Sequence, residues 1–566
     1  MFFSLRAYNT DGDPMPGRRD FIKMAVLGVG GFVVGLGALY YFSRGLQTPV
    51  STPTNTGGKA STITTGARAP PTPIKGGELR IELISDIVRL DPHASTAAVD
   101  RQVYQAIYDH FLDPDENGNI VSAICESWSQ PDSRTYIFRI KDGIKFHDGT
   151  RLDADAIVWN FNRMLGKLDK RLLPNPNARA SEVALIDSVK AEDSLTLRIT
   201  LKNSFAPFLS ILTDRAGMFI SPISFEKDPE GFLQKPVGAG PFKFVEWRKG
   251  DRLIVERFEG YYRSGLPYLD RIIYTFQADA TQRLNDLRSG TVDMIQAFAQ
   301  KDIDVVKREA SQGNLAYSVK ATWGWQGYEL NTRKPPFDNK LLRKAFMYAI
   351  NVDDIVNTIY YGIDVPANYG PITPAHGIFY DPSYRPHSRW PKADLDTANK
   401  MLRDAGYPDG FEFELQTGVD PVAKLEAELI QSQLARIGVK FKITQLDFTR
   451  QLSNLEQGNY QASAIGWSGR PDPDQNSYMF WRTGGSFNFM GYSNPRVDEL
   501  FDQARAESDL SRRAKIYRQI IDILYDDAPY IFVRYPADPK AWRPYVKGFI
   551  HIADGMIRPA GLWISR

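Results

Sequence analysis

The sequence predicts an α/β protein that folds into more than one lobe. With 566 residues, the chain is too long for a single ordinary hydrophobic core. Stretches with the period-two pattern of strands alternate with stretches that have the period of an amphipathic helix. In the second half, strand, helix and strand follow one another through short links, which implies crossover units and parallel pairing.

The folded body is expected to begin near Ile74. Residues 78–84 and 135–140 alternate polar and apolar side chains, which predicts two strands. A further short strand is predicted at residues 144–146, just before the turn at 147–149.

A helix is predicted after Asp153, which is a suitable N-cap residue. Its apolar face would contain Ile157, Phe161 and Leu165.

The second half carries the clearer pattern. The helix predicted at residues 395–405 is followed by Gly406, and the helix at 421–437 is followed by Gly438, which are suitable C-terminal stop residues. Strands are predicted at residues 411–415, 439–446 and 462–467. In open α/β sheets, ligands bind outside the carboxyl ends of strands, so residues 467–474 are the first candidate binding loop.

Composition excludes several functional classes. The hydrophobic share of 43%, the charged share of 24% and the net charge of +2 are typical of a soluble globular body that needs no nucleic acid partner. The single cysteine, Cys125, allows no intramolecular disulfide, and the six histidines form no metal-binding motif. No nucleophile elbow, P-loop, zinc-protease or dinucleotide motif is present, so neither catalysis nor a cofactor or metal is expected.

The amino-terminal 45 residues are interpreted as an export signal or membrane anchor. Arg18 and Arg19 are followed by Phe21 and Lys23 and then by the uncharged stretch 24–42, and this order is similar to a twin-arginine signal. As a helix, that stretch would be about 28 Å long, close to the hydrocarbon thickness. No small-x-small cleavage site closes the apolar run, which favours an uncleaved tether over a removed signal.

Residues 46–73 are rich in Thr, Pro, Gly and Ser. Such a stretch cannot bury enough apolar surface to fold and is interpreted as a flexible stalk.

Several blocks, taken in order, resemble the family 5 extracellular solute-binding proteins of ABC importers, the peptide- and nickel-binding type. The blocks are residues 123–128 (AICESW) with 146–149 (FHDG), 236–242 (PVGAGPF) with 245–247 (VEW) and 260–262 (GYY), 287–293 (LRSGTVD), and 331–332 (NT) with 336–338 (PFD), 343–345 (RKA) and 349–351 (AIN). Each block alone is weak, but their order along the chain is specific.

The resemblance implies a two-lobed periplasmic-binding-protein-like fold of class II, the large three-domain type, with a hinge and an interlobe ligand cleft. It implies the following division: residues 74–110, 222–330 and 536–566 in lobe I, residues 111–221 in an inserted domain, and residues 331–535 in lobe II. It also implies an extracytoplasmic, monomeric body that captures a peptide or similar small polar solute for ABC permease subunits in the membrane.

In peptide-binding members, the loop that matches residues 467–474 carries an aspartate that pairs with the ligand's ammonium. Here Trp467, Ser468 and Gly469 match that loop, but Arg470 stands where the acid would be. An arginine repels an ammonium and favours a carboxylate or phosphate. Two alternatives stay open: Arg470 braces the loop by pairing with Asp472 or Asp474, or one of these aspartates still supplies the acid.

Further candidate ligand contacts are aromatic or amide side chains near the expected cleft: Trp323, Trp325, Tyr328, Tyr369 and Asn488. Core packing competes with ligand contact for each of them.

Two other functions are kept as alternatives. An exported hydrolase would use a pair of carboxylates such as Asp472 and Asp474. A membrane-tethered sensor would pass ligand occupancy to a partner, although the segment before Arg18 is too short for a cytoplasmic signalling domain.

Overall fold

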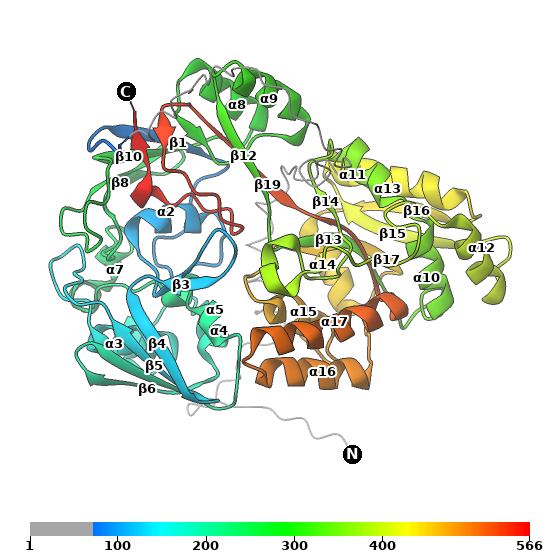
Figure 1. Ribbon diagram of the computed structural model, residues 1–566, viewed down its shortest axis with the longest axis horizontal. Helices are drawn as coiled ribbons and strands as arrows, with labels where there is room; N and C mark the ends of the chain where they lie inside the picture. The colour runs from blue at the N-terminus through cyan, green and yellow to red at the C-terminus, as the bar shows by residue number, and fades with distance from the viewer. Residues whose placement is uncertain (1–71, 566) are drawn as a thin grey trace, which may run out of the picture.

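The computed structural model describes residues 72–565 of the chain (Figure 1). The predicted signal or anchor at residues 1–45 lies outside this range, as does the predicted stalk at 46–73 apart from its last two residues. Within residues 72–565, no helix combines the length and the apolar character that a membrane crossing requires.

The first lobe is organised around a mixed sheet of seven strands from both ends of the body. The strand order is β12 (Ala316–Ala321), β19 (Ala537–Trp542), β11 (Met294–Ile295), β1 (Glu78–Leu83), β10 (Arg271–Phe276), β9 (Arg252–Arg257) and β8 (Phe242–Arg248). Met294 and Ile295 are neighbours on β11 but enter different apolar clusters, so both faces of this sheet are covered. The helices of this lobe are α2 (Asp100–Ile107), α6 (Pro222–Lys227), α7 (Pro229–Phe232), α8 (Ala280–Ser289) and α9 (Ile303–Ser311).

A second antiparallel unit lies below the first lobe in Figure 1. Its strand order is β4 (Cys125–Asp132), β5 (Thr135–Ile140), β7 (Thr196–Leu201) and β6 (Ile186–Asp193), and the hairpin β2 (Leu112–Pro114) and β3 (Ile120–Ser122) precedes it. The predicted helix is present as α3 (Ala154–Met164), and the Asp153 side chain accepts a hydrogen bond from the Ala156 N–H at 3.1 Å. The short helices α4 (Ala180–Val183) and α5 (Phe208–Ile211) complete the unit.

The strand predicted at residues 144–146 is wrong. Lys145 forms only an isolated bridge with Arg151, and the Phe146 N–H donates to the Thr150 carbonyl at 2.9 Å. The segment folds back through the turn at 147–149 onto residues 150–152, and this short contact is too limited to form a strand.

The second lobe contains a sheet of six strands in the order β14 (Val365–Pro366), β18 (Tyr530–Tyr535), β13 (Trp325–Leu330), β17 (Ala462–Trp467), β15 (Glu412–Gly418) and β16 (Lys440–Leu446). Its helices are α10 (Lys340–Ala349), α11 (Val352–Ile359), α12 (Leu395–Asp404), α13 (Pro421–Ala435), α14 (Phe448–Gln457), α15 (Pro473–Trp481), α16 (Pro495–Ala506) and α17 (Leu510–Asp527).

The crossover units predicted for the second half are confirmed. β15 pairs in parallel with both β16 and β17. Gly406 and Gly438, the predicted stop residues, have φ values of 83° and 75°, in the left-handed region that glycine tolerates at helix ends.

Two chain segments join the lobes side by side. β12 leads into β13 through residues 322–324, and β18 leads into β19 through Pro536. The N–H and the Oγ1 of Thr322 both donate to the Pro536 carbonyl, each at 2.8 Å, so the two crossings are bonded to each other. β13 belongs to the six-stranded sheet, whereas the division implied by the family resemblance put residues up to 330 in the first lobe.

The antiparallel unit beside the first lobe also touches the second lobe, away from these crossings. The Ala206 N–H donates to the Arg505 carbonyl at 2.9 Å, and the Ser210 Oγ donates to Gln475 Oε1 at 2.9 Å. The side chains that face one another between the lobes are therefore seen in a conformation in which the lobes are in contact.

Candidate interlobe binding site

The loop that follows β17 lies directly against a crossing segment. Gly469 has a φ of 79°, and a Cβ at this position would lie 2.1 Å from the carbonyl carbon of Trp323. Only glycine allows this approach. The loop ends at Asp472, which accepts a hydrogen bond from the Asp474 N–H at 2.8 Å and caps α15.

Asn476, a fully buried residue of α15, holds this loop in place. Its Oδ1 accepts hydrogen bonds from the Arg470 N–H at 2.7 Å and from the Trp467 Nε1 at 3.1 Å. Its Nδ2 donates to the Trp323 carbonyl at 3.3 Å. The sequence analysis did not single out Asn476, because a helical asparagine carries no local pattern that reveals a tertiary role.

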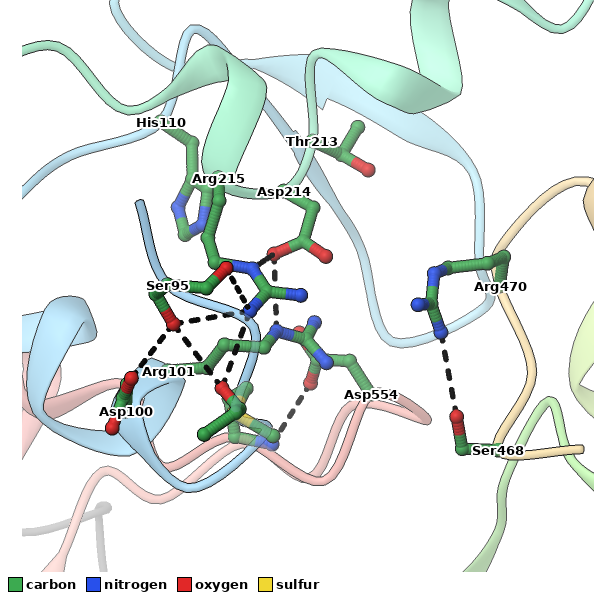
Figure 2. A network of polar contacts seen from close by, with 12 residues as sticks. Ser95, Asp100, Arg101, His110, Thr213, Asp214, Arg215, Ser468, Arg470 and Asp554 are labelled. Carbon is green, nitrogen blue, oxygen red and sulfur yellow. Dashed lines mark hydrogen bonds and ion pairs between the residues drawn. The ribbon is translucent and has the colours of Figure 1, made fainter. Parts of the chain in front are cut away.

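Arg470 is half-buried at the interlobe surface and points toward the first lobe (Figure 2). Its Nη1 donates to the Gly469 carbonyl at 2.6 Å and to Ser468 Oγ at 3.4 Å, and its guanidinium lies 5.0 Å from the Trp467 ring centre. It forms no ion pair with any carboxylate between residues 72 and 565. Burial lowers the pKa of the Arg470 guanidinium to about 10, an effect that Asp214 counteracts only in part.

A charged group on the first-lobe side faces Arg470. Asp214 Oδ1 lies 3.0 Å from the Nε of Arg101 and 3.7 Å from the Nε of Arg215. Burial by itself would raise the pKa of Asp214, but the surrounding arginines outweigh it and hold that pKa far below its usual range. We call Arg101, Asp214, Arg215 and Arg470 the interlobe cluster.

Arg215 is anchored within the first lobe rather than aimed at the other one. Its Nη1 donates to the carbonyls of Ser95 and Ala97, each at 3.2 Å. The Ser95 Oγ donates in turn to Asp100 Oδ2 at 2.7 Å, as Figure 2 shows. These bonds hold Arg215 through its Nη1, whereas its Nη2, like the terminal nitrogens of Arg101 and the Nη2 of Arg470, makes no hydrogen bond with residues 72–565.

The two aspartates of the loop are already occupied. Arg513 donates to both Asp472 oxygens, each at 2.6 Å, and Arg505 donates to both Asp474 oxygens, at 2.7 and 2.9 Å. Neither carboxylate is free for a ligand's ammonium or for acid–base chemistry, and neither pairs with Arg470.

Of the other predicted contacts, Trp323 lies at the crossing, where its Nε1 donates to the Ala375 carbonyl at 3.0 Å. Trp325 and Tyr328 on β13 are buried in the second-lobe core, and their polar atoms bond to the Asn476 carbonyl at 3.2 Å and to Glu426 at 2.7 Å.

Tyr369 and Asn488 also lie inside the second lobe. The Tyr369 ring packs edge-on against two other tyrosines, and Asn488 bonds to the backbone of Arg482 and Tyr492. The structure brings Ser468, Gly469 and Arg470 to the interlobe surface together and does not bring Trp325, Tyr328, Tyr369 or Asn488 there.

The described part of the chain contains no group of three or more His, Cys, Asp or Glu side chains arranged to hold a metal ion. The site is thus built from guanidinium, carboxylate, hydroxyl and backbone groups. Such groups recognise charged organic solutes.

Two lobes joined by paired crossing segments, with charged side chains facing one another between them, define a two-lobed solute-binding protein. The model of the bacterial extracellular solute-binding proteins, family 5 (middle region), matches residues 119–488. The chain therefore belongs to the family 5 extracellular solute-binding proteins, and it serves as the substrate-binding component of an ABC importer. Members of this family are binding proteins rather than enzymes.

Named relatives agree with this assignment. The chain is 29% identical to the glutathione-binding protein GsiB of Pectobacterium atrosepticum over 79% of this chain and 87% of the relative. It is similar to the structure of the periplasmic binding protein DppA from Helicobacter pylori in complex with the peptide STSA, with 26% identity and a TM-score of 0.71 over 87% of this chain and 99% of that one. It also resembles HbpA2 from Haemophilus parasuis, with 23% identity and a TM-score of 0.77 over 87% of this chain and 100% of that one, which shows the shared fold. The predicted two-lobed fold is confirmed.

Proposed function

We propose that this substrate-binding protein captures a small, peptide-like solute whose carboxylate, or a similar anionic group, pairs with Arg470 between the lobes. One observation carries the proposal. Arg470 is a half-buried guanidinium without an ion-pair partner among the described residues. Because an unpaired buried charge is costly, a bound anion would remove that cost in the closed protein.

The relatives support a peptide-like or acidic ligand. GsiB is named for glutathione, a tripeptide that carries carboxylates. A further structure with 26% identity, the binding protein AgaA from Agrobacterium tumefaciens R10, was solved with agropinic acid (TM-score 0.68 over 87% of this chain and 99% of that one).

The test replaces Arg470 by glutamine. A charged hydrogen bond is worth about 1.5–3 kcal/mol, so we expect the Kd for anionic ligands to rise about 10- to 100-fold in Arg470→Gln. Ligands are first found by their effect on the melting temperature, from free-amino peptides, amino-blocked peptides, dicarboxylates, sugars and metal chelates. Their Kd values are then measured by titration calorimetry.

Arg436→Gln is the matched control, because Arg436 is an exposed arginine at the end of α13, far along the chain from the loop. We expect it to leave the Kd unchanged. Binding of the same ligands with equal affinity by wild type and Arg470→Gln would refute the proposal.

The site further includes, in this proposal, Ser468 and Gly469 beside Arg470, whereas the loop carboxylate of Asp472 serves the loop itself. No catalytic residue is assigned. The hydrolase alternative is not supported, because Asp472 and Asp474 are both held in ion pairs with arginines. No observation favours the tethered sensor.

We also propose that the twin-arginine-like sequence at Arg18 and Arg19 directs export and that the apolar stretch after it keeps the protein at the outer face of the membrane. Replacing both arginines by lysine keeps the charge but removes the pair. We expect this variant to remain in the cytoplasmic fraction of cells, whereas the wild type is found outside the cytoplasm and sediments with membranes. Export of the double-lysine variant at the wild-type level would contradict a twin-arginine route.

A further inference from the structure

The carboxylate of Asp214 has two different sides. Its Oδ1 is buried and faces Arg101 and Arg215, and it takes part in ion pairs without a well-aligned hydrogen bond. The side chain as a whole is 14% exposed, so the exposed part lies on its other side. In Figure 2, the second oxygen of Asp214 points away from these two arginines, toward the space that Arg470 faces.

Arg101 is the matching cation on the same side of the site. Its side chain makes no hydrogen bond with any residue from 72 to 565, and its only ion pair within that range is the one from Nε to Asp214, with 15% of the side chain exposed. Figure 2 shows its terminal nitrogens directed toward the same space as the second oxygen of Asp214.

The space between the lobes is therefore bordered by an available acceptor on Asp214 and by the guanidinium groups of Arg101 and Arg470, while Arg215 beside them is only 4% exposed. Arg101 and Asp214 come from the first-lobe side, and Arg470 comes from the second lobe. Arg470 is close enough for the charges of Asp214 and Arg101 to act on it. A ligand with only negative charge would leave the free oxygen of Asp214 facing a like charge, which is unfavourable.

The separation of these groups limits the ligand. The Nε of Arg101 and the Oδ1 of Asp214 are 3.0 Å apart, so a ligand that meets both residues must carry its ammonium and its carboxylate close together. In an ordinary α-linked peptide, the amino and carboxyl ends belong to different residues, whose α-carbons are about 3.8 Å apart for each peptide unit. In a free amino-acid head group, both charges are attached to one carbon.

We propose that the interlobe cluster binds an amino-acid head group: Asp214 accepts hydrogen bonds from the α-ammonium, and Arg101 and Arg470 donate to the α-carboxylate. This inference rests on the proposed function and names the ligand class more closely. The class consists of solutes in which an amino acid is linked to the rest of the molecule through its side chain, so that its head group stays free, as in γ-linked peptides. Because the three residues come from both lobes, such a ligand stabilises the conformation in which the lobes touch.

In this arrangement the acid, Asp214, and the loop arginine, Arg470, lie on opposite sides of the site. A head group bound here would be turned so that its carboxylate faces the second lobe.

Two isomeric dipeptides test the inference on the wild-type full chain. γ-Glutamylglycine carries ammonium and carboxylate on one carbon, whereas α-glutamylglycine has the same atoms and charges without that head group. By titration calorimetry, we expect γ-glutamylglycine to bind at least 10-fold more tightly. N-acetyl-γ-glutamylglycine, which lacks the ammonium, should bind at least 10-fold more weakly than γ-glutamylglycine.

Asp214→Asn is the matching variant. It should weaken the binding of γ-glutamylglycine at least 10-fold while leaving the affinity for the acetylated form unchanged or improved. A general loss of structure would instead weaken the binding of both ligands equally. If this variant does not fold, the comparison of the two isomers on the wild type still decides the question.

Equal binding of the two isomers would overturn the inference, as would equal binding with and without the acetyl group. The inference would also be overturned if none of the three dipeptides bound while other anionic solutes did so. In each case, loss of anion binding in Arg470→Gln would leave the proposed function standing, so the two failures can be told apart.

Discussion

Replacing Asp472 by alanine is expected to lower the free energy of unfolding by about 3–5 kcal/mol, the usual cost of removing one partner from a buried ion pair. The Arg513 side chain is 2% exposed and that of Asp472 is 11% exposed. Apart from Asp472, the hydrogen-bond partners of this guanidinium among residues 72–565 are only the Ala504 carbonyl at 2.9 Å and the Tyr517 hydroxyl at 3.5 Å. Without the carboxylate, a nearly buried positive charge would remain unpaired.

Urea denaturation monitored by tryptophan fluorescence measures this loss. Asp409→Ala is the control, because Asp409 is an exposed aspartate in a turn of the same lobe, and it should change the free energy of unfolding by less than about 0.5 kcal/mol. Adding Arg513→Met to Asp472→Ala should recover part of the loss, since the unpaired charge is then gone. A cost below about 1 kcal/mol for Asp472→Ala would show that solvent reaches Arg513.

The same substitution should also weaken ligand binding. Asp472 caps α15, the helix whose Asn476 fixes the backbone of Arg470. A less ordered loop presents the guanidinium less well to an anion. In contrast to Arg470→Gln, however, Asp472→Ala would lower both stability and affinity.

Local patterns were enough to predict the helices α12 and α13 and the strands β15, β16 and β17 of the second lobe. The helices α12 and α13 are each followed by a glycine and alternate with short strands, and each of these features depends on residues close in sequence. The failed strand at residues 144–146 shows the limit of this approach. Its apolar pattern was correct, but pairing requires a neighbouring strand, which a local pattern does not reveal.

Candidate aromatic residues were harder to place from the sequence. Trp325 and Tyr328 follow the crossing immediately, but β13 lies in the middle of a sheet between β17 and β18. Helices and apolar side chains cover such a strand, so residues at both phases of its alternation become buried. Closeness to the crossing in sequence therefore did not mean exposure between the lobes.

The charged residues of the site owe their positions to contacts between residues that are distant in sequence. Asp472 and Arg513 are separated by 41 positions, and Asp214 faces Arg470 only because the inserted unit folds toward the second lobe. Arg470 was recognised because it replaces an acid expected from related proteins. Asp214 had no comparable reference, because no local pattern marks an aspartate that faces a distant part of the chain.

The stability of the protein should also depend on a carboxyl group far from the site. Glu329 on β13 is 3% exposed, and burial raises its pKa to about 8, while a hydrogen bond from Tyr460 and the charge of Arg333 lower it only in part. In the unfolded chain this carboxyl has its ordinary pKa, so between about pH 5 and 8 it loses its proton on unfolding. The contribution of Glu329 to the free energy of unfolding is therefore fully present below the ordinary pKa. It falls by about 1.4 kcal/mol per pH unit as the pH rises toward 8.

Glu329→Gln removes this titration and retains an oxygen that can accept the hydrogen bond from Tyr460. We expect the variant to be more stable than the wild type by about 3–4 kcal/mol at pH 8, a difference that shrinks to near zero at pH 5. Urea titrations of both proteins across this range measure the difference. Glu412→Gln, which changes an exposed glutamate on β15, should show no such trend. A constant difference between Glu329→Gln and the wild type over the whole range would mean that Glu329 is ionised in the folded protein and that Arg333 and Tyr460 stabilise its charge more than burial destabilises it.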